Sequence, residues 1–174
     1  MSAPRLLVPV TEVRRRPGTR IPVERSMPAE GLALTDVGVP DGAPIALVGA
    51  IESIAGGVVL EGDVSVPWVG ACRRCLREVT GTATVDVREI YETVPTDGET
   101  WPLVDDQIDL GPLLHDTALL ALPLAPLCAD DCVGPAPDDF PTGTEPVDDA
   151  GDEGADVESP RDPRWAALDD LDFD

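Results

Sequence analysis

The four cysteines of this chain lie in two closely spaced pairs. Cys72 and Cys75 form a C-x2-C pair, and 52 residues separate it from the C-x3-C pair of Cys128 and Cys132. Four thiolates from two pairs suit tetrahedral zinc, which binds sulfur at about 2.3 Å. The spacing therefore predicts a zinc site that joins two distant segments, provided that the fold brings the pairs together. Reduced cysteines without a metal, and a redox or disulfide pair, are the alternatives.

Few other residues could support chemistry. His115 is the only histidine and falls in a leucine-rich segment, which favours a structural role. No serine or cysteine can be paired by sequence with a base. The acidic pairs Asp105-Asp106 and Asp130-Asp131 are typical of solvated loops. We therefore expect no enzymatic activity and no small-molecule substrate.

The first cysteine pair lies between two segments that have the pattern of β-strands. In residues 58–68 and 79–91, apolar and polar side chains alternate with a period of two, which indicates half-buried strands. Residues 45–51 are apolar on both faces, as expected of a central strand. The two alternating segments predict a hairpin with Cys72 and Cys75 at its tip.

The second cysteine pair follows a segment with a helical pattern. Asp109 is the expected N-cap, Pro112 lies in the first turn, and Pro123 and Pro126 end the helix. Strands followed by one apolar helix predict an α+β domain. We expect a curled antiparallel β-sheet with this helix packed on it.

Charge is distributed unevenly along the 174 residues, whose net charge is −22. Residues 1–26 hold six arginines and two glutamates, a net charge of +4, whereas residues 27–128 carry −12 and residues 129–174 carry −14. A basic N-terminal arm and an acidic tail thus flank a folded middle. So negative a surface disfavours general binding to nucleic acid. The sequence has no apolar run of membrane-spanning length, and we expect a cytoplasmic protein with no membrane partner.

The acidic tail divides into two parts. Residues 133–160 are rich in Pro, Gly, Asp and Glu and have little to bury, which predicts a disordered linker. Residues 161–174 predict a short helix that presents Trp165 on one face, to dock on its own domain or in a partner's groove. The predicted divisions are therefore a domain with its basic arm over 1–132, a linker over 133–160 and a helix over 161–174.

The basic arm contains the candidates for contact with RNA phosphate or with a partner. These residues are Arg14, Arg15, Arg16 and Arg20. An exposed arm that pairs with the protein's own acids is the alternative.

Four segments, in this order, resemble the YceD family. They are Arg15–Gly18, Cys72–Leu76, Leu119–Cys128 and Asp162–Leu168. The composition, with arginine as its only basic residue besides histidine, resembles an actinobacterial member. The resemblance implies a role in accumulation of 23S ribosomal RNA, and so in large-subunit assembly, without a known enzymatic activity. In many genomes the family's gene neighbours that of a small, basic, zinc-ribbon ribosomal protein.

The chain departs from its apparent relatives after the second cysteine pair. Actinobacterial members tend to continue with a Gly-Leu-Cys-x-x-Cys-Gly segment, whereas this chain has Gly134-Pro135-Ala136-Pro137. A local four-cysteine site is therefore impossible here. Either Cys72 and Cys75 complete the site or the metal is lost.

Charge and the resemblance lead to one hypothesis. A non-enzymatic factor of this charge would bind a basic ribosomal protein or a large-subunit precursor, while its arginine arm contacts ribosomal RNA. Complementary charge raises the rate of encounter, and the attraction weakens as salt is added. The alternative is an acidic zinc-binding adaptor or regulator unrelated to ribosomes.

Overall fold

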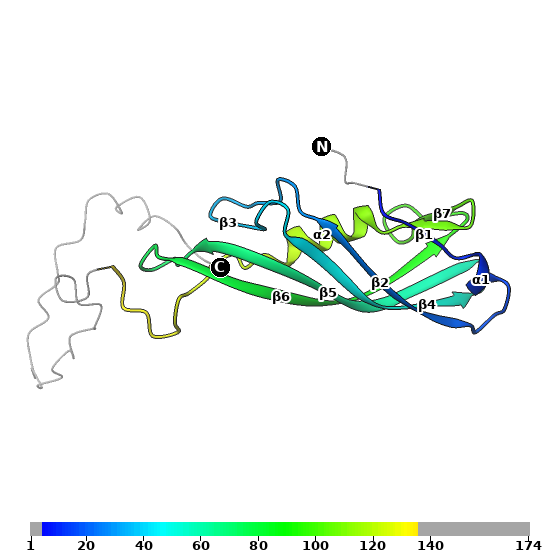
Figure 1. The fold of residues 1–174 in the computed structure, drawn as a ribbon, viewed down its shortest axis with the longest axis horizontal. Coiled ribbons are helices and arrows are strands. Elements are labelled where there is room, and N and C mark those ends of the chain that lie inside the picture. The colour runs from blue at the N-terminus through cyan, green and yellow to red at the C-terminus, as the bar shows by residue number, and fades with distance from the viewer. Residues whose placement is uncertain (1–4, 136–174) are drawn as a thin grey trace, which may run out of the picture. The chain divides into compact units, whose positions relative to one another are not determined.

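A twisted eight-stranded sheet and two helices make up residues 5–135, the part of the chain that the computed structural model describes (Figure 1). The strand order is β1-β8-β7-β6-β5-β4-β2, and β3 pairs with β5 outside this path. The strands are β1 (Leu7–Pro9), β2 (Arg20–Pro28), β3 (Val37–Gly38), β4 (Pro44–Ile54), β5 (Gly57–Ala71), β6 (Glu78–Glu92), β7 (Trp101–Val104) and β8 (Gln107–Asp109). The helices are α1 (Thr11–Arg14) and α2 (Gly111–Ala121), and neither is long and apolar enough to cross a membrane.

The predicted α+β class is confirmed, with two differences in detail. The sheet is mixed rather than wholly antiparallel, because the chain turns after β6 and β7 then pairs parallel to it, at Tyr91–Trp101 and Glu92–Pro102. A short second helix, α1, precedes the long strands. The tail from residue 136 onward, including the predicted helix over 161–174, lies outside the described residues.

The segment singled out as basic contributes several elements to the sheet. β1 pairs with β8, α1 follows it, and all nine residues of β2 pair with β4. β2 contributes the buried Val23 and Met27 to the core, although Arg25 between them is exposed. Residues 7–28 are therefore held by pairing along the backbone as well as by side-chain packing.

The core lies between the sheet and α2. Buried side chains of β4, β5, β6 and α2 belong to one core cluster, and Tyr91 at the end of β6 is fully buried and stacks on Trp101 with ring centroids 6.3 Å apart. Each fully buried aliphatic side chain contributes about 1.5–3 kcal/mol relative to exposure. The largest fully buried side chains besides Tyr91 are Ile45, Leu47, Ile51, Leu60, Ile108, Leu110 and Leu114.

The predicted N-cap of α2, Asp109, is wrong by one residue, and the helix begins at Gly111. Leu110 occupies the N-cap position, and Asp109, the last residue of β8, accepts hydrogen bonds from the backbone N–H groups of Leu6 and Gly111 at 2.8 and 3.0 Å. The carboxylate thus joins the start of the helix to the N-terminal segment. Pro112 lies in the first turn, and the extended backbone of Leu122 ends the helix ahead of Pro123.

A pair of facing glycines allows β4 and β5 to approach closely. Gly49 and Gly62 are partners in the register of the two strands. A Cβ atom added at Gly62 would lie 2.5 Å from the carbonyl oxygen of Val48 and 2.6 Å from the Cα of Gly49. These neighbours are backbone atoms, which cannot move aside as a flexible side chain could. Close approach of two backbones is a common reason for glycine inside a strand.

Gly62→Ala should destabilise the domain by about 1–3 kcal/mol, because the added methyl group forces the two backbones apart. Chemical denaturation followed by circular dichroism measures this loss. Ser65→Ala, at a half-exposed position of the same strand, is the control and should change the free energy of unfolding by less than about 0.5 kcal/mol. Equal stability of Gly62→Ala and the native chain would show that the close approach is not a constraint on the fold.

Candidate metal centre

The first cysteine pair lies at the tip of the hairpin formed by β5 and β6, as the alternating pattern predicts. The backbone N–H of Cys72 donates to the carbonyl of Arg77 at 2.8 Å, which continues the strand register into the tip. The N–H of Leu76 donates to the carbonyl of Cys72 at 2.9 Å and closes a tight turn. Leu76 adopts a left-handed backbone with φ of 60°. This turn holds Cys75 close to Cys72.

The second pair lies on the irregular segment that follows α2. Pro123 and Pro126 keep this segment from continuing the helix, and the carbonyl of Pro126 accepts a 2.9 Å hydrogen bond from the backbone N–H of Arg73. The Arg74 guanidinium donates to the carbonyls of Asp130 and Cys132, at 3.2 and 2.7 Å. The hairpin tip therefore holds the segment with its backbone and with one arginine side chain.

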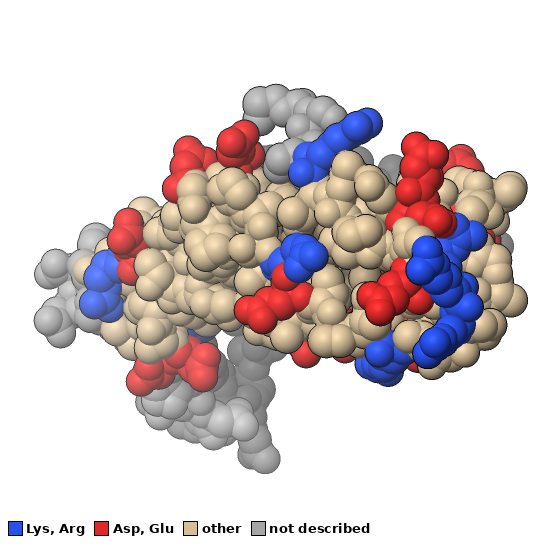
Figure 2. Space-filling view, turned by 45° about the vertical axis from the view of Figure 1, so that its right-hand side comes forward, with Lys and Arg blue, Asp and Glu red and all other residues tan. Residues whose placement is uncertain are grey.

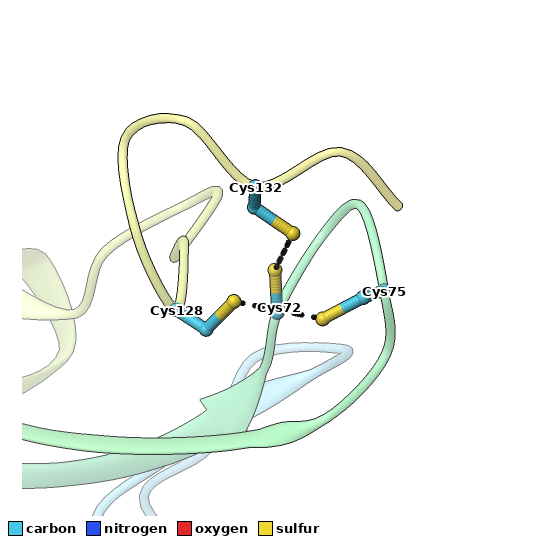
Figure 3. A group of neighbouring side chains, drawn as sticks. All are labelled: Cys72, Cys75, Cys128 and Cys132. Atoms are coloured by element: carbon cyan, nitrogen blue, oxygen red, sulfur yellow. Dashed lines mark hydrogen bonds between the residues drawn. The ribbon is translucent and has the colours of Figure 1, made fainter. Parts of the chain in front are cut away.

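All four sulfur atoms lie within 4.8 Å of one another and point toward a common centre (Figure 3). The Sγ atoms of Cys72 and Cys132 are 3.9 Å apart, and those of Cys75 and Cys128 are 3.6 Å apart. Four sulfurs placed tetrahedrally at about 2.3 Å from zinc would be separated by about 3.8 Å. Distances this long also leave all four cysteines as free thiols rather than disulfides. The arrangement fits zinc.

The surroundings lower the pKa of two of the thiols and raise the pKa of a third. Hydrogen bonding by the backbone N–H of Cys75 lowers the pKa of Cys72 to about 6, although burial opposes it. The Arg77 side chain lowers the pKa of Cys75. Hydrogen bonds with the Cys132 and Cys75 side chains raise the pKa of Cys128 to about 12. Thiolates so close together repel one another, and a bound cation would favour all four in the charged form.

Arg77 contacts one sulfur from each pair. Its Nε donates to Sγ of Cys75 at 3.4 Å, and a terminal nitrogen donates to Sγ of Cys128 at 3.6 Å. A tetrathiolate zinc site carries a net charge of −2, so a guanidinium at this place offsets part of it. Such outer contacts orient the ligands and tune the metal. The spacing of the two cysteine pairs predicts the four ligands but does not single out Arg77. The one indication in the sequence is that three arginines lie within or beside the first pair.

Four thiolates fill every position of a tetrahedral ion, and sites of this kind are structural. Cys72, Cys75 and Cys132 are buried in a small cluster of their own with Val79 and Leu127, away from the main core. A metal here would fix the hairpin tip to the segment after α2. It would leave no coordination position for a water molecule or a substrate.

The arginine candidates lie at the other end of the hairpin. α1 contacts the ends of β4 and β5 that are remote from the tip, and fifteen residues of β5 at about 3.3 Å each separate the two regions. Figure 2 shows arginine side chains following one another across this end, with acidic side chains beside them. Arg14 forms an ion pair with Asp106, and Arg20 lies 3.9 Å from Glu52 and 3.5 Å from Glu61.

Arg15 and Arg16 are exposed at the same end, and neither forms an ion pair within the described part of the chain. The structure therefore brings the four cysteines together and leaves the arginines as a separate group. His115 is half-buried on α2 and its Nδ1 lies 3.0 Å from the carboxylate of Asp116. Trp165 lies outside the described residues.

Comparison with known proteins gives one family and several relatives. The family model of the large ribosomal RNA subunit accumulation protein YceD matches residues 60–172. Uncharacterized proteins of Mycobacterium tuberculosis and Mycobacterium bovis are each 33% identical over 174 residues, 94% of this chain and 79% of theirs. One of Mycobacterium leprae is 32% identical over 133 residues, 72% of this chain and 61% of that protein. No solved structure matches.

The purified chain should contain about one zinc ion per molecule, because the four sulfurs already have the spacing of a tetrahedral site. Mass spectrometry of metals, together with titration of free thiols, measures both quantities. Cys72→Ser and Cys132→Ser, from different pairs, should lose the zinc to the same extent. Four reactive thiols and no metal in the native chain would contradict a zinc site.

Arg77→Gln should leave zinc bound but speed its transfer to a chelator about tenfold, because the sulfurs lose a charged donor. The measurement is the rate of zinc transfer to a coloured chelator. Arg88→Gln is the matched control: it removes an arginine of β6, the strand that begins directly after Arg77, and this arginine contacts Glu61 at 2.9 Å instead of the cysteines. Equal rates in the two variants would mean that Arg77 does not tune the site.

Proposed function

The chain belongs to the YceD family, and on this basis we propose that it is a non-enzymatic cytoplasmic factor that supports accumulation of large-subunit ribosomal RNA. The observation that carries the proposal is the family match, which covers β5 from Leu60 onward, β6, α2 and all four cysteines. The mycobacterial relatives agree with an actinobacterial type of member. The name of the family links it to the large subunit.

We propose that the partner is a basic ribosomal protein or a large-subunit precursor. The net charge of −22 supports this, because a strongly acidic protein is drawn to basic surfaces and repelled by most of a nucleic acid. Ribosomal proteins bind RNA through basic surfaces, so they carry complementary charge. Binding of this kind weakens as salt rises.

The proposed contact with ribosomal RNA is the end of the sheet near α1, which carries Arg14, Arg15, Arg16 and Arg20. Arg15 and Arg16 are exposed there, whereas Arg14 and Arg20 lie beside Asp106 and Glu61. We therefore expect Arg15 and Arg16 to contribute most to a phosphate contact. Trp165, outside the described residues, stays a proposed contact to a partner.

Zinc in the proposed role has no catalytic part. Cys72, Cys75, Cys128 and Cys132 would hold it with every position filled, so it would stabilise the hairpin tip against the segment that follows α2. A structural site agrees with a factor that works by binding. An acidic adaptor unrelated to ribosomes would have the same metal site, so the experiment must examine ribosomal particles directly.

Deletion of the gene should reduce mature large subunits and lower the ratio of 23S to 16S RNA, because the proposed factor acts before the large subunit is complete. Sucrose gradients of cell extracts measure both, and a tagged copy should sediment with large-subunit precursors. A normal profile, with the tagged protein only at the top of the gradient, would contradict a ribosomal role and favour the adaptor.

Complementation tests the proposed RNA contact within the same assay. A copy with Arg15→Ser and Arg16→Ser should restore the 23S to 16S ratio less well than a copy with Arg25→Ser. Arg25 is a suitable control because it is also exposed and, among the described residues, donates only to the carbonyl of Glu24, at 2.7 Å. Equal rescue by both copies would exclude a role for the two arginines.

A further inference from the structure

Most of one edge of β6 has no neighbouring strand within residues 5–135. β6 pairs with β5 over all fifteen of its residues, but with β7 only at Tyr91 and Glu92. In Figure 1, β6 borders the sheet along its lower side. The stretch from Glu78 to Ile90 therefore offers a backbone edge to which a further strand could be added.

The hydrogen-bond pattern shows which residues face that edge. The backbone N–H of Cys72 donates to the carbonyl of Arg77, so Cys72 and Arg77 are a hydrogen-bonded pair. From there, non-hydrogen-bonded and hydrogen-bonded pairs alternate along the hairpin. The N–H and C=O groups of β6 that therefore point away from β5 include those of Thr80, Thr82, Thr84 and Asp86. Pro67, which has no N–H, is the partner of Thr82 and agrees with this pattern.

We call the backbone of residues 80–86 the free edge. Thr80, Thr82, Thr84 and Asp86 are all exposed, and no residue of the described chain bonds to their backbone groups. The side chains on the opposite face are half-buried, apart from the buried Val87, and include Val79, Ala83 and Val85. An added strand would thus gain main-chain hydrogen bonds and cover apolar side chains at the border of the core.

The opposite edge of the sheet, at β2, is protected by proline. Ser53 donates to the carbonyl of Thr19, so the outward-facing backbone positions of β2 include Pro22, Ser26 and Pro28. Proline lacks the N–H that strand addition requires, and it is a common means of protecting an edge. The free edge contains no proline and is rich in Thr and Val, residues that favour strands.

Charge beside the free edge indicates what kind of strand would bind. Asp86 and Asp63 are directly opposite each other on the outer face, and like charges in that position are destabilising. Neither forms an ion pair with a described residue, and the nearby Arg88 already contacts Glu61. A basic side chain on an added strand, next to Asp86, would relieve this repulsion.

We propose that the free edge binds an extended segment of a basic ribosomal protein, which adds to β6 as a further strand. The proposal rests on the function proposed above and assigns the surface that performs it. The segment would alternate apolar residues toward Ala83 and Val85 with basic residues beside Asp86. A second copy of this chain, or its own acidic tail, is disfavoured by charge, because residues 129–174 carry −14.

Thr82→Pro and Thr84→Pro test the proposal, because each removes one N–H from the free edge and leaves the bonds to β5 intact. The probe is RNA-free protein extracted from purified large subunits, passed over the immobilised full chain at low salt. Each proline should weaken binding of the retained ribosomal protein about tenfold, the effect of one lost hydrogen bond and its strand contacts. Ser26→Pro, on the β2 edge, and Thr84→Val, which keeps the N–H, should bind like the native chain.

The outcomes separate the two proposals. Equal retention of a basic ribosomal protein by the native chain and by both proline variants would overturn strand addition and leave the proposed function in place. If the native chain retains no ribosomal protein at low salt, the proposed partner fails and strand addition fails with it. Circular dichroism of each proline variant shows whether its fold is intact.

Hydrogen exchange of the native full-length chain provides a second measurement that needs no variant. The amides of Thr80, Thr82, Thr84 and Asp86 should exchange rapidly in the free protein and become protected once the retained ribosomal protein is bound. Protection in the free, monomeric chain would instead assign the edge to the chain's own tail. Protection that rises with concentration, together with dimers, would assign it to a second copy.

Discussion

The antiparallel register of β5 and β6 fixes the positions of the metal centre and of the free edge. Fifteen successive pairs, from Gly57–Glu92 to Ala71–Glu78, determine which side chains reach the core and which backbone groups face outward. A shift of one residue would turn every side chain of a strand to the other face. The same register brings Cys72 and Arg77 opposite each other, so the turn between them presents two sulfurs at one end of the hairpin.

The metal centre links parts of the chain that the main core does not join. The cysteine cluster is separate from the core under α2, and it connects the hairpin tip to the segment that follows this helix. Without a metal, the four thiols do not all ionise together, because the pKa of Cys72 and Cys75 is lowered whereas that of Cys128 is raised to about 12. The tip is followed directly by Glu78, the first residue of β6, and the free edge begins two residues later. A rigid tip would therefore also hold that edge in place.

The sequence predicts those parts of the structure that depend on local pattern. Alternation over 58–68 and 79–91 identifies β5 and β6 and places Cys72 and Cys75 between them, as observed. β2 is not predicted, because Pro22 and Pro28 are usually signs of a loop, whereas here they occupy outward-facing positions of an edge strand. The meeting of cysteines 52 residues apart depends on where α2 ends relative to the tip. The role of Arg77 depends on the same tertiary contact.

Photocrosslinking in growing cells can show whether a ribosomal protein adds to the free edge of β6. A photoreactive amino acid placed at Thr82 reports what lies against the free edge, and one placed at Ser26 reports on the proline-protected edge. If the free edge binds as proposed, Thr82 crosslinks to a basic protein of the large subunit, in fractions that contain precursor particles, and Ser26 does not. Crosslinks from both positions to the same proteins, or from Thr82 only to another part of its own chain, would contradict it.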